Sequence, residues 1–113
     1  MVIDGDTGAE MSMLPDKLVG KLSSFFKVLG DDTRVKIIYA LSRQELCVTD
    51  IAAQLDISQS AISHQLKQLR AEGLVRVRRD GKNIFYALDD NHVLDIINVA
   101  ISHIRHKVRD GEL

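Results

Sequence analysis

The sequence has few of the features that stabilise or target proteins outside the cell. It contains a single cysteine, Cys47, so no disulfide can form within the chain. No stretch approaches the roughly 18 consecutive apolar residues that cross a membrane. The N-terminus has neither the basic nor the apolar segment of a secretory signal. We therefore expect a cytoplasmic protein in a reducing compartment, with no membrane partner.

The sequence also lacks a large net charge, which is −1 in total, but its charges are separated along the chain. The first sixteen positions hold four acidic side chains and no basic one. The segment 67–82 holds six basic side chains against two acidic ones, a local balance of +4. A total close to neutral therefore does not exclude a polyanionic partner.

At 113 residues, the chain is long enough for one hydrophobic core and too short for two. It contains no internal repeat and no low-complexity segment. Residues 1–13 combine acidic residues and glycines with few large apolar groups, which predicts a flexible N-terminal arm. Residues 14–110 are expected to fold as one domain, which then carries every function of the chain.

Helical spacing of apolar residues predicts two helices at the start of this domain. The first begins near Asp16, and Gly30 is expected to end it in a left-handed cap. Asp31 or Asp32 is expected to cap the second helix, which should stop near Ser42. The repeated apolar positions are Leu18, Leu22, Phe25, Phe26 and Leu29 in the first helix, and the expected buried side of the second is Val35, Ile37, Ile38 and Leu41.

Two short helices around a tight turn are predicted next. Thr49 is expected to cap the first, residues 56–58 turn the chain, and Ser58 is expected to cap the second. The inward-facing residues of the pair are Ile51, Ala52, Leu55, Ile62, Leu66 and Leu69. This order of elements predicts a helix-turn-helix.

A hairpin and a final helix complete the domain. After Gly73 the pattern changes to period two on both sides of Asp80 and Gly81, which is typical of a β-hairpin. From Asp90 to about Lys107 helical spacing returns. The expected fold class is therefore mainly α with a small β-hairpin, and the hairpin takes the place of the wing in a winged helix-turn-helix.

A helix-turn-helix places its second helix in the major groove of DNA, and this one has the side chains for that role. Its outward positions are Gln59, Ser60, Ser63, His64 and Lys67. Gln59 can pair with adenine, the serines can donate to or accept from base edges, and Lys67 suits a phosphate. In the hairpin, Arg78, Arg79 and Lys82 are placed to grip the flanking backbone. The alternative is an ordinary amphipathic helix and hairpin that only face water.

The final helix carries three of the four histidines, His92, His103 and His106, with Asp90 just before them. At 100° per residue, His103 lies about 20° around the helix from His92 and His106 about 40° the other way, so the three share one stripe. The eleven residues from His92 to His103 rise by about 16 Å, whereas one ion holds its ligands at about 2 Å. One chain alone therefore cannot close a metal site with these groups.

Two antiparallel copies of this helix solve the problem, because facing residues then have a constant sum of residue numbers. Asp90 faces His106 and His92 faces His103 in nearly the same register, while Ile96 and Val99 fill the seam between them. Each dimer then holds two symmetric four-ligand sites, and each site takes Asp90 and His92 from one subunit and His103 and His106 from the other. The alternative is a histidine-lined helix interface without metal.

At this point the sequence closely resembles the ArsR/SmtB family of metalloregulatory repressors over about residues 18–107. The motifs that carry the resemblance are residues 29–34 (LGDDTR), 45–50 (ELCVTD), 58–66 (SQSAISHQL) and the terminal ligand set. Asp32 stands where many members have proline, and aspartate also suits the first turn of a helix. The resemblance implies a homodimer packed through its N- and C-terminal helices. It also implies a repressor that binds operator DNA without metal and loses affinity when metal binds across the C-terminal helices.

The ligand set is similar to that of the zinc- and cobalt-responsive branch of the family, so we expect zinc, or alternatively cobalt, at two ions per dimer. Nickel sensors of the family add further histidines, and none follows His106. Cys47 and Asp50 match a second metal site of the family. That site also needs cysteine or histidine from the N-terminal arm, and residues 1–15 contain neither.

Three other functions are compatible with parts of the sequence. A repressor of the same fold with a non-metal trigger, such as oxidation of Cys47, would keep the histidines as interface residues. A zinc enzyme would need an open coordination position, whereas four protein ligands close the shell, so we expect no catalysis and no small-molecule substrate. A metal buffer without a DNA role would leave the basic hairpin unexplained.

Overall fold

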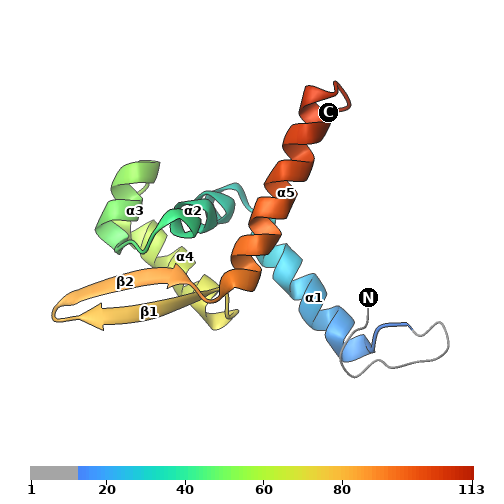
Figure 1. The fold of residues 1–113 in the computed structure, drawn as a ribbon. Coiled ribbons are helices and arrows are strands. Elements are labelled where there is room, and N and C mark those ends of the chain that lie inside the picture. Colours follow the sequence, from blue (N-terminus) through green and yellow to red (C-terminus); the bar gives the residue numbers. More distant parts are fainter. Residues whose placement is uncertain (1–12) are drawn as a thin grey trace.

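The computed structural model describes residues 13–113. The predicted N-terminal arm, residues 1–13, lies outside this range except for its last residue. Five helices and one two-stranded antiparallel sheet follow one another in the described part of the chain (Figure 1). They are α1 (Asp16–Leu29), α2 (Asp32–Arg43), α3 (Val48–Leu55), α4 (Gln59–Ala71), β1 (Val75–Asp80), β2 (Asn83–Leu88) and α5 (Asn91–Arg109). Their order is the predicted one.

Caps explain where α2 and α4 begin. The side chain of Asp31 accepts a hydrogen bond from the backbone N–H of Arg34 at 3.0 Å, and Ser58 Oγ accepts from Ala61 N at 3.2 Å. Each side chain satisfies one N–H that the first turn of the helix leaves without a partner. The predicted caps Asp31 and Ser58 are thus confirmed.

Two other predicted caps are wrong, although α1 does end at Gly30 as expected. α3 begins at Val48 with Cys47 as its N-cap residue, without a side-chain cap, so Thr49 lies inside the helix. Gly30 ends α1 with φ −84°, outside the left-handed region, because its N–H bonds back to Lys27 O in a tighter turn. The left-handed cap occurs instead at Asp56, which ends α3 with φ 54°. Aspartate tolerates that conformation better than most residues that have a Cβ.

The hairpin pairs β1 with β2 in the register Val75 to Leu88 through Asp80 to Asn83. The two-residue turn contains Gly81 at φ 62°, as expected for a tight hairpin turn. Leu46 extends the sheet by one bridge, because it exchanges backbone hydrogen bonds with Tyr86 at 3.0 and 2.8 Å. The segment before α3 therefore holds the base of the hairpin against the helices.

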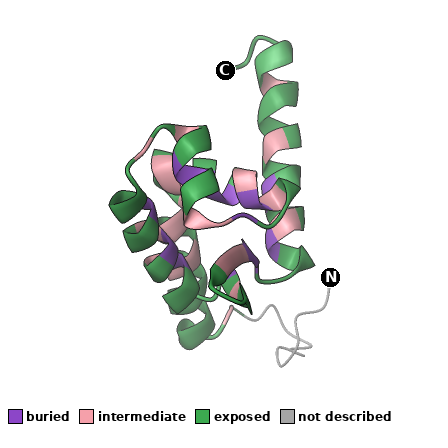
Figure 2. Cartoon of the chain, turned by 90° about the vertical axis from the view of Figure 1, so that its left-hand side faces the viewer, coloured by how far each residue is buried: buried purple, intermediate pink, exposed green. Residues whose placement is uncertain are grey.

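The core lies where α2, α3 and α4 meet the base of the hairpin and the first turns of α5 (Figure 2). Its fully buried side chains are Ile37, Ile38, Ile51, Ile62, Leu66, Leu69 and Leu74. Val35, which we expected on the buried side of α2, is 45% exposed and was wrongly assigned. Val35 points to a different side of α2 from Ile37, Ile38 and Leu41, and it lines a groove between α2 and α5.

α1 and most of α5 extend away from this core (Figure 1). α1 has no buried residue, and α5 has only two, Val93 and Ile97, near its start. We call the large apolar side chains left exposed on α1, α2 and α5 the apolar face: Leu18, Val19, Leu22, Phe26, Val35, Tyr39, Ile96, Val99, Ile104 and Val108. None of the helices in the described part of the chain is long and apolar enough to span a membrane.

Candidate nucleic-acid interface and metal site

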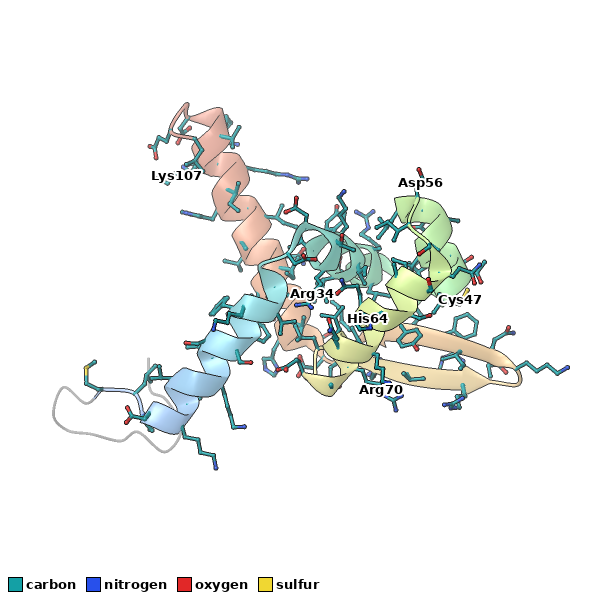
Figure 3. All side chains as sticks on the ribbon, turned by 180° about the vertical axis from the view of Figure 1, so that it is seen from behind. Arg34, Cys47, Asp56, His64, Arg70 and Lys107 are labelled. Carbon is teal, nitrogen blue, oxygen red and sulfur yellow. The ribbon has the colours of Figure 1, made fainter. Side chains whose placement is uncertain are left out.

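α4 presents the predicted polar side chains on one side and the core on the other. Gln59, Ser60, Ser63, His64 and Lys67 are all exposed, whereas Ile62, Leu66 and Leu69 are buried. α3 and the turn at Asp56 pack against α4 from the neighbouring side (Figure 3). The helix that would enter a major groove is therefore braced by the core and leaves its polar side open.

A group of residues not predicted from the sequence connects α4 to α2 and α1. Arg34 of α2 donates from Nε to Gln65 Oε1 at 2.7 Å and from Nη2 to Gln68 Oε1. Its Nη1 also donates to the carbonyl oxygen of Val28 in the last turn of α1, at 3.4 Å. Gln65 and Gln68 each precede a buried leucine of α4. This spacing is the only feature of the sequence that indicates that they face α2.

In the hairpin, the three predicted phosphate-binding residues have different surroundings. Arg79 and Lys82 are exposed, Lys82 at the tip beside Gly81. Arg78 is also exposed but pairs with Glu45, with Nη2 3.0 Å from Oε1 and Nε 3.1 Å from the same oxygen. This hydrogen bond raises the pKa of Arg78. Glu45 occupies the Nε and Nη2 edge of Arg78, so a phosphate that binds this edge has to compete with Glu45.

At the start of α5, the predicted ligands Asp90 and His92 touch. Asp90 is the N-cap residue, and its Oδ1 accepts from His92 N at 2.9 Å and from Val93 N at 3.2 Å. Its other oxygen, Oδ2, lies 3.4 Å from His92 Nδ1. The backbone hydrogen bond from Val93, and then the side chain of His92, lower the pKa of Asp90. The fold thus favours the carboxylate anion and directs one of its oxygens to an imidazole. These two groups are suited to bind the same metal cation.

The other two predicted ligands lie toward the far end of α5. His103 is exposed and lines a shallow, mainly apolar hollow with Ile96 and Val99. His106 has a partner on each ring nitrogen: Nε2 lies 3.1 Å from Asp110 Oδ2 and Nδ1 2.7 Å from Arg109 Nη2. Metal binding at His106 has to displace one of these partners.

Within residues 13–113 of one protomer, no three histidine, cysteine, aspartate or glutamate side chains gather closely enough to hold a metal ion. The helical rise along α5 predicts this result, because it separates Asp90 and His92 from His103 and His106. One carboxylate and three imidazoles, all exposed, are a donor set that zinc accepts, provided that a second chain brings the halves together. Cys47, half-buried, is the N-cap residue of α3, and Asp50, exposed, lies in its first turn. The second metal site stays a prediction.

Comparison with known proteins places this architecture in a family. The family model for bacterial regulatory proteins of the arsR family matches residues 31–77. A transcriptional repressor SmtB homolog from Synechocystis is 45% identical over 85 residues, which cover 75% of this chain and 64% of that protein. A cadmium resistance transcriptional regulatory protein CadC homolog from Staphylococcus aureus is 44% identical over 91 residues, which cover 80% of this chain and 75% of that protein.

A solved structure supports the same assignment. The homodimeric winged helix-turn-helix DNA-binding domain Mb0332 from Mycobacterium bovis superposes with a TM-score of 0.74 at 26% identity, covering 88% of this chain and 95% of that one. The hairpin β1–β2 that follows α3 and α4 is therefore the wing of a winged helix-turn-helix, as predicted. The chain belongs to the ArsR family of bacterial regulatory proteins, the ArsR/SmtB family that its sequence motifs resemble.

Proposed function

We propose that this chain is a metal-responsive transcriptional repressor of the bacterial cytoplasm. It binds operator DNA as a homodimer without metal and is released when zinc, or cobalt, binds between the C-terminal helices. The regulatory names of its relatives support a regulator over a zinc enzyme, and the cadmium resistance named for one of them supports a metal as the trigger.

The observation that carries the proposal is the seam on α5. Val99 is 69% exposed and Ile96 39% exposed, and both lie on the stripe between His92 and His103. Exposing such side chains to water is unfavourable, and an antiparallel copy of α5 covers them in the register that also joins the two pairs of ligands. The remainder of the apolar face, on α1 and α2, gives the same partner further area to bury.

Each metal site in this dimer takes Asp90 and His92 from one protomer and His103 and His106 from the other, so there are two sites per dimer. A bound ion supplies a covalent-like link between the two α5 helices. The chain's own groups are suited to this. Asp90 keeps its helix cap with Oδ1 and offers Oδ2, while His106 exchanges one hydrogen-bond partner for the ion.

DNA recognition belongs to α4 and the wing in this proposal. Gln59, Ser60, Ser63 and His64 contact bases or phosphates from the exposed side of α4, and Lys67 binds phosphate. Arg79 and Lys82 bind the backbone beside the groove, and Arg78 joins them after leaving Glu45. Because α5 packs on β2 and the core, a change in how the two α5 helices meet alters the spacing of the two α4 helices.

The test is a zinc titration of the protein bound to a fluorescent AT-rich palindromic duplex at fixed salt, followed by anisotropy. We expect zinc to release the wild type and not the double variant Asp90→Asn/His103→Gln. Asparagine keeps an oxygen for the helix cap, so this variant should still fold and bind DNA. Ser102→Ala, an exposed neighbour of His103, is the matched control and should respond as the wild type does.

Two other outcomes separate the alternatives. Zinc that binds without changing the anisotropy makes the α5 site purely structural and contradicts the proposal. A Cys47→Ser variant that loses the response moves the trigger to Cys47, whereas an unchanged response in this variant excludes both thiol oxidation and the second metal site as the trigger.

A further inference from the structure

Arg34 connects its own helix, α2, to α1 and α4, and it acts only as a hydrogen-bond donor. Its guanidinium donates to Val28 of α1 and to both Gln65 and Gln68 of α4, and the side chain is half-buried. Figure 3 shows Arg34 and His64 close together where α2 passes α4, and Gln68 is the side chain that joins them. Arg34 is therefore connected to His64, on the exposed, polar side of α4, through Gln68.

The chemistry of these groups determines which way the Gln68 amide points. A guanidinium has five N–H donors and no acceptor, so the Gln68 atom that faces Arg34 must be the carbonyl oxygen. The amide nitrogen is then directed to the other side, where it lies 3.3 Å from His64 Nε2. An amide NH₂ can only donate, so His64 Nε2 has to accept.

A neutral imidazole carries one proton, and it must then be on Nδ1. Among the described residues, His64 has no hydrogen-bond partner other than Gln68, so this Nδ1–H has no partner within residues 13–113. His64 occupies the sixth position of α4, nearly two turns after the Ser58 cap and on the same side as Gln59, Ser60 and Ser63. An Nδ1–H donor is thus presented on the side of α4 that faces outward.

We propose that Arg34 is a positioning residue for DNA recognition. Acting through Gln68, it fixes His64 as the Nδ1–H tautomer, so that α4 offers a hydrogen-bond donor to an acceptor atom of the duplex. That acceptor is a base-edge oxygen or nitrogen in the major groove or a phosphate oxygen. The inference rests on the proposed DNA-binding function and adds to it the donor character of His64 and its cause.

The tautomer is measured without DNA or metal, from the ring nitrogens of ¹⁵N-labelled protein by long-range ¹H–¹⁵N correlation at an alkaline pH of about 8.5. We expect a protonated Nδ1 and a bare Nε2 at His64 in the wild type. Arg34→Met and Gln68→Met should both lose this fixed tautomer and give averaged shifts. Arg43→Met is the matched control, because Arg43 also lies on α2 but donates to Tyr39.

Two results of this experiment would overturn the inference. One is an Nε2–H tautomer in the wild type. The other is an Nδ1–H tautomer that persists in both Arg34→Met and Gln68→Met, since the relay would then not be its cause. Because Gln68→Met leaves Arg34 and its bonds to Val28 and Gln65 in place, it tests the relay even if Arg34→Met fails to fold.

The contact with DNA is measured by anisotropy of the metal-free protein on the palindromic duplex and on a scrambled duplex of equal length and composition. We expect His64→Ala and Arg34→Met each to weaken binding about two- to tenfold, the range for one hydrogen bond. The double variant should bind no more weakly than His64→Ala alone, because both changes remove the same contact. Additive losses would show that Arg34 acts elsewhere, against the inference.

A comparison of the two duplexes distinguishes the acceptors. A loss confined to the palindrome assigns His64 to a base edge, and an equal loss on both assigns it to phosphate. Wild-type protein that binds neither duplex would refute the proposed repressor function. Wild-type binding that His64→Ala leaves unchanged would refute only the present inference.

Discussion

Arg78 in the wing and Glu45 before α3 form an ion pair, with Arg78 Nη2 3.0 Å from Glu45 Oε1. The same guanidinium lies 4.8 Å from the ring centre of Phe85, its cross-strand neighbour in β2. The ion pair joins the wing to the segment before α3, whereas the contact with Phe85 lies within the wing. The ion pair also places a carboxylate beside one of the basic side chains that would bind DNA, so Glu45 and phosphate compete for Arg78.

Glu45→Gln should therefore strengthen DNA binding. An exposed ion pair is weak, so the gain should not exceed about fivefold. The plot of log affinity against log salt concentration should keep its slope, because Arg78 neutralises the same phosphate in both proteins. Anisotropy titrations at several salt concentrations measure both. Glu72→Gln, an exposed acid after α4, is the control, and an unchanged affinity in Glu45→Gln would argue against a phosphate contact by Arg78.

Ser58→Ala should destabilise the protein by about 0.5–2 kcal/mol, because Ala61 N–H then loses its partner at the start of α4. DNA affinity should fall as well, since the first turn of α4 carries Gln59 and Ser60. Urea unfolding at one fixed protein concentration gives the free energy of unfolding. Ser63→Ala, an exposed serine inside the same helix, should leave it nearly unchanged. Equal losses in the two variants would mean that the cap contributes little.

Val99→Glu should convert the dimer to monomers. In the proposed antiparallel register His92 faces His103, which places the two-fold axis near Asn98. The two copies of residue 99 then lie close together, and the variant would bury two like charges. A cost of several kcal/mol weakens dimerisation by roughly 100-fold or more. Sedimentation velocity over a concentration series measures this, with Leu113→Glu as an exposed apolar control beyond α5. A Val99→Glu protein that remains dimeric would exclude the antiparallel α5 seam.

Asp90 should stabilise the metal-free protein in a pH-dependent way. Its pKa is lowered in the folded state, so the fold favours the anion, and the stabilisation is complete above the ordinary aspartate pKa of about 4. It is lost as the pH falls through the lower, folded-state value. The melting temperatures of the wild type and Asp90→Asn should therefore differ near pH 6 and converge toward pH 3. A constant difference across this range would mean that the charge of Asp90 has no part in the cap.

The candidate DNA-binding helix could be predicted closely because its causes are local. Ser58 can cap only the helix that follows it, and Ile62, Leu66 and Leu69 recur at a spacing that places them on one buried side. The hairpin was equally predictable from its period-two pattern and from Gly81. The caps at Thr49 and Gly30 were predicted wrongly, although α1 ends at Gly30 as expected, because local residue preferences are weak compared with the packing around them.

The sequence by itself determined the order of the elements, the core side of α4 and the stripe that places His92, His103 and His106 on one side of α5. These follow from helical and strand periods, which depend only on neighbours along the chain. Only the tertiary structure decided that Arg34 orients Gln68, that Glu45 pairs with Arg78 and that Val35 is exposed. Those outcomes depend on which residues distant in sequence meet in space, and hydrogen-bond donors and charges take whichever partner the packing of the helices brings within reach.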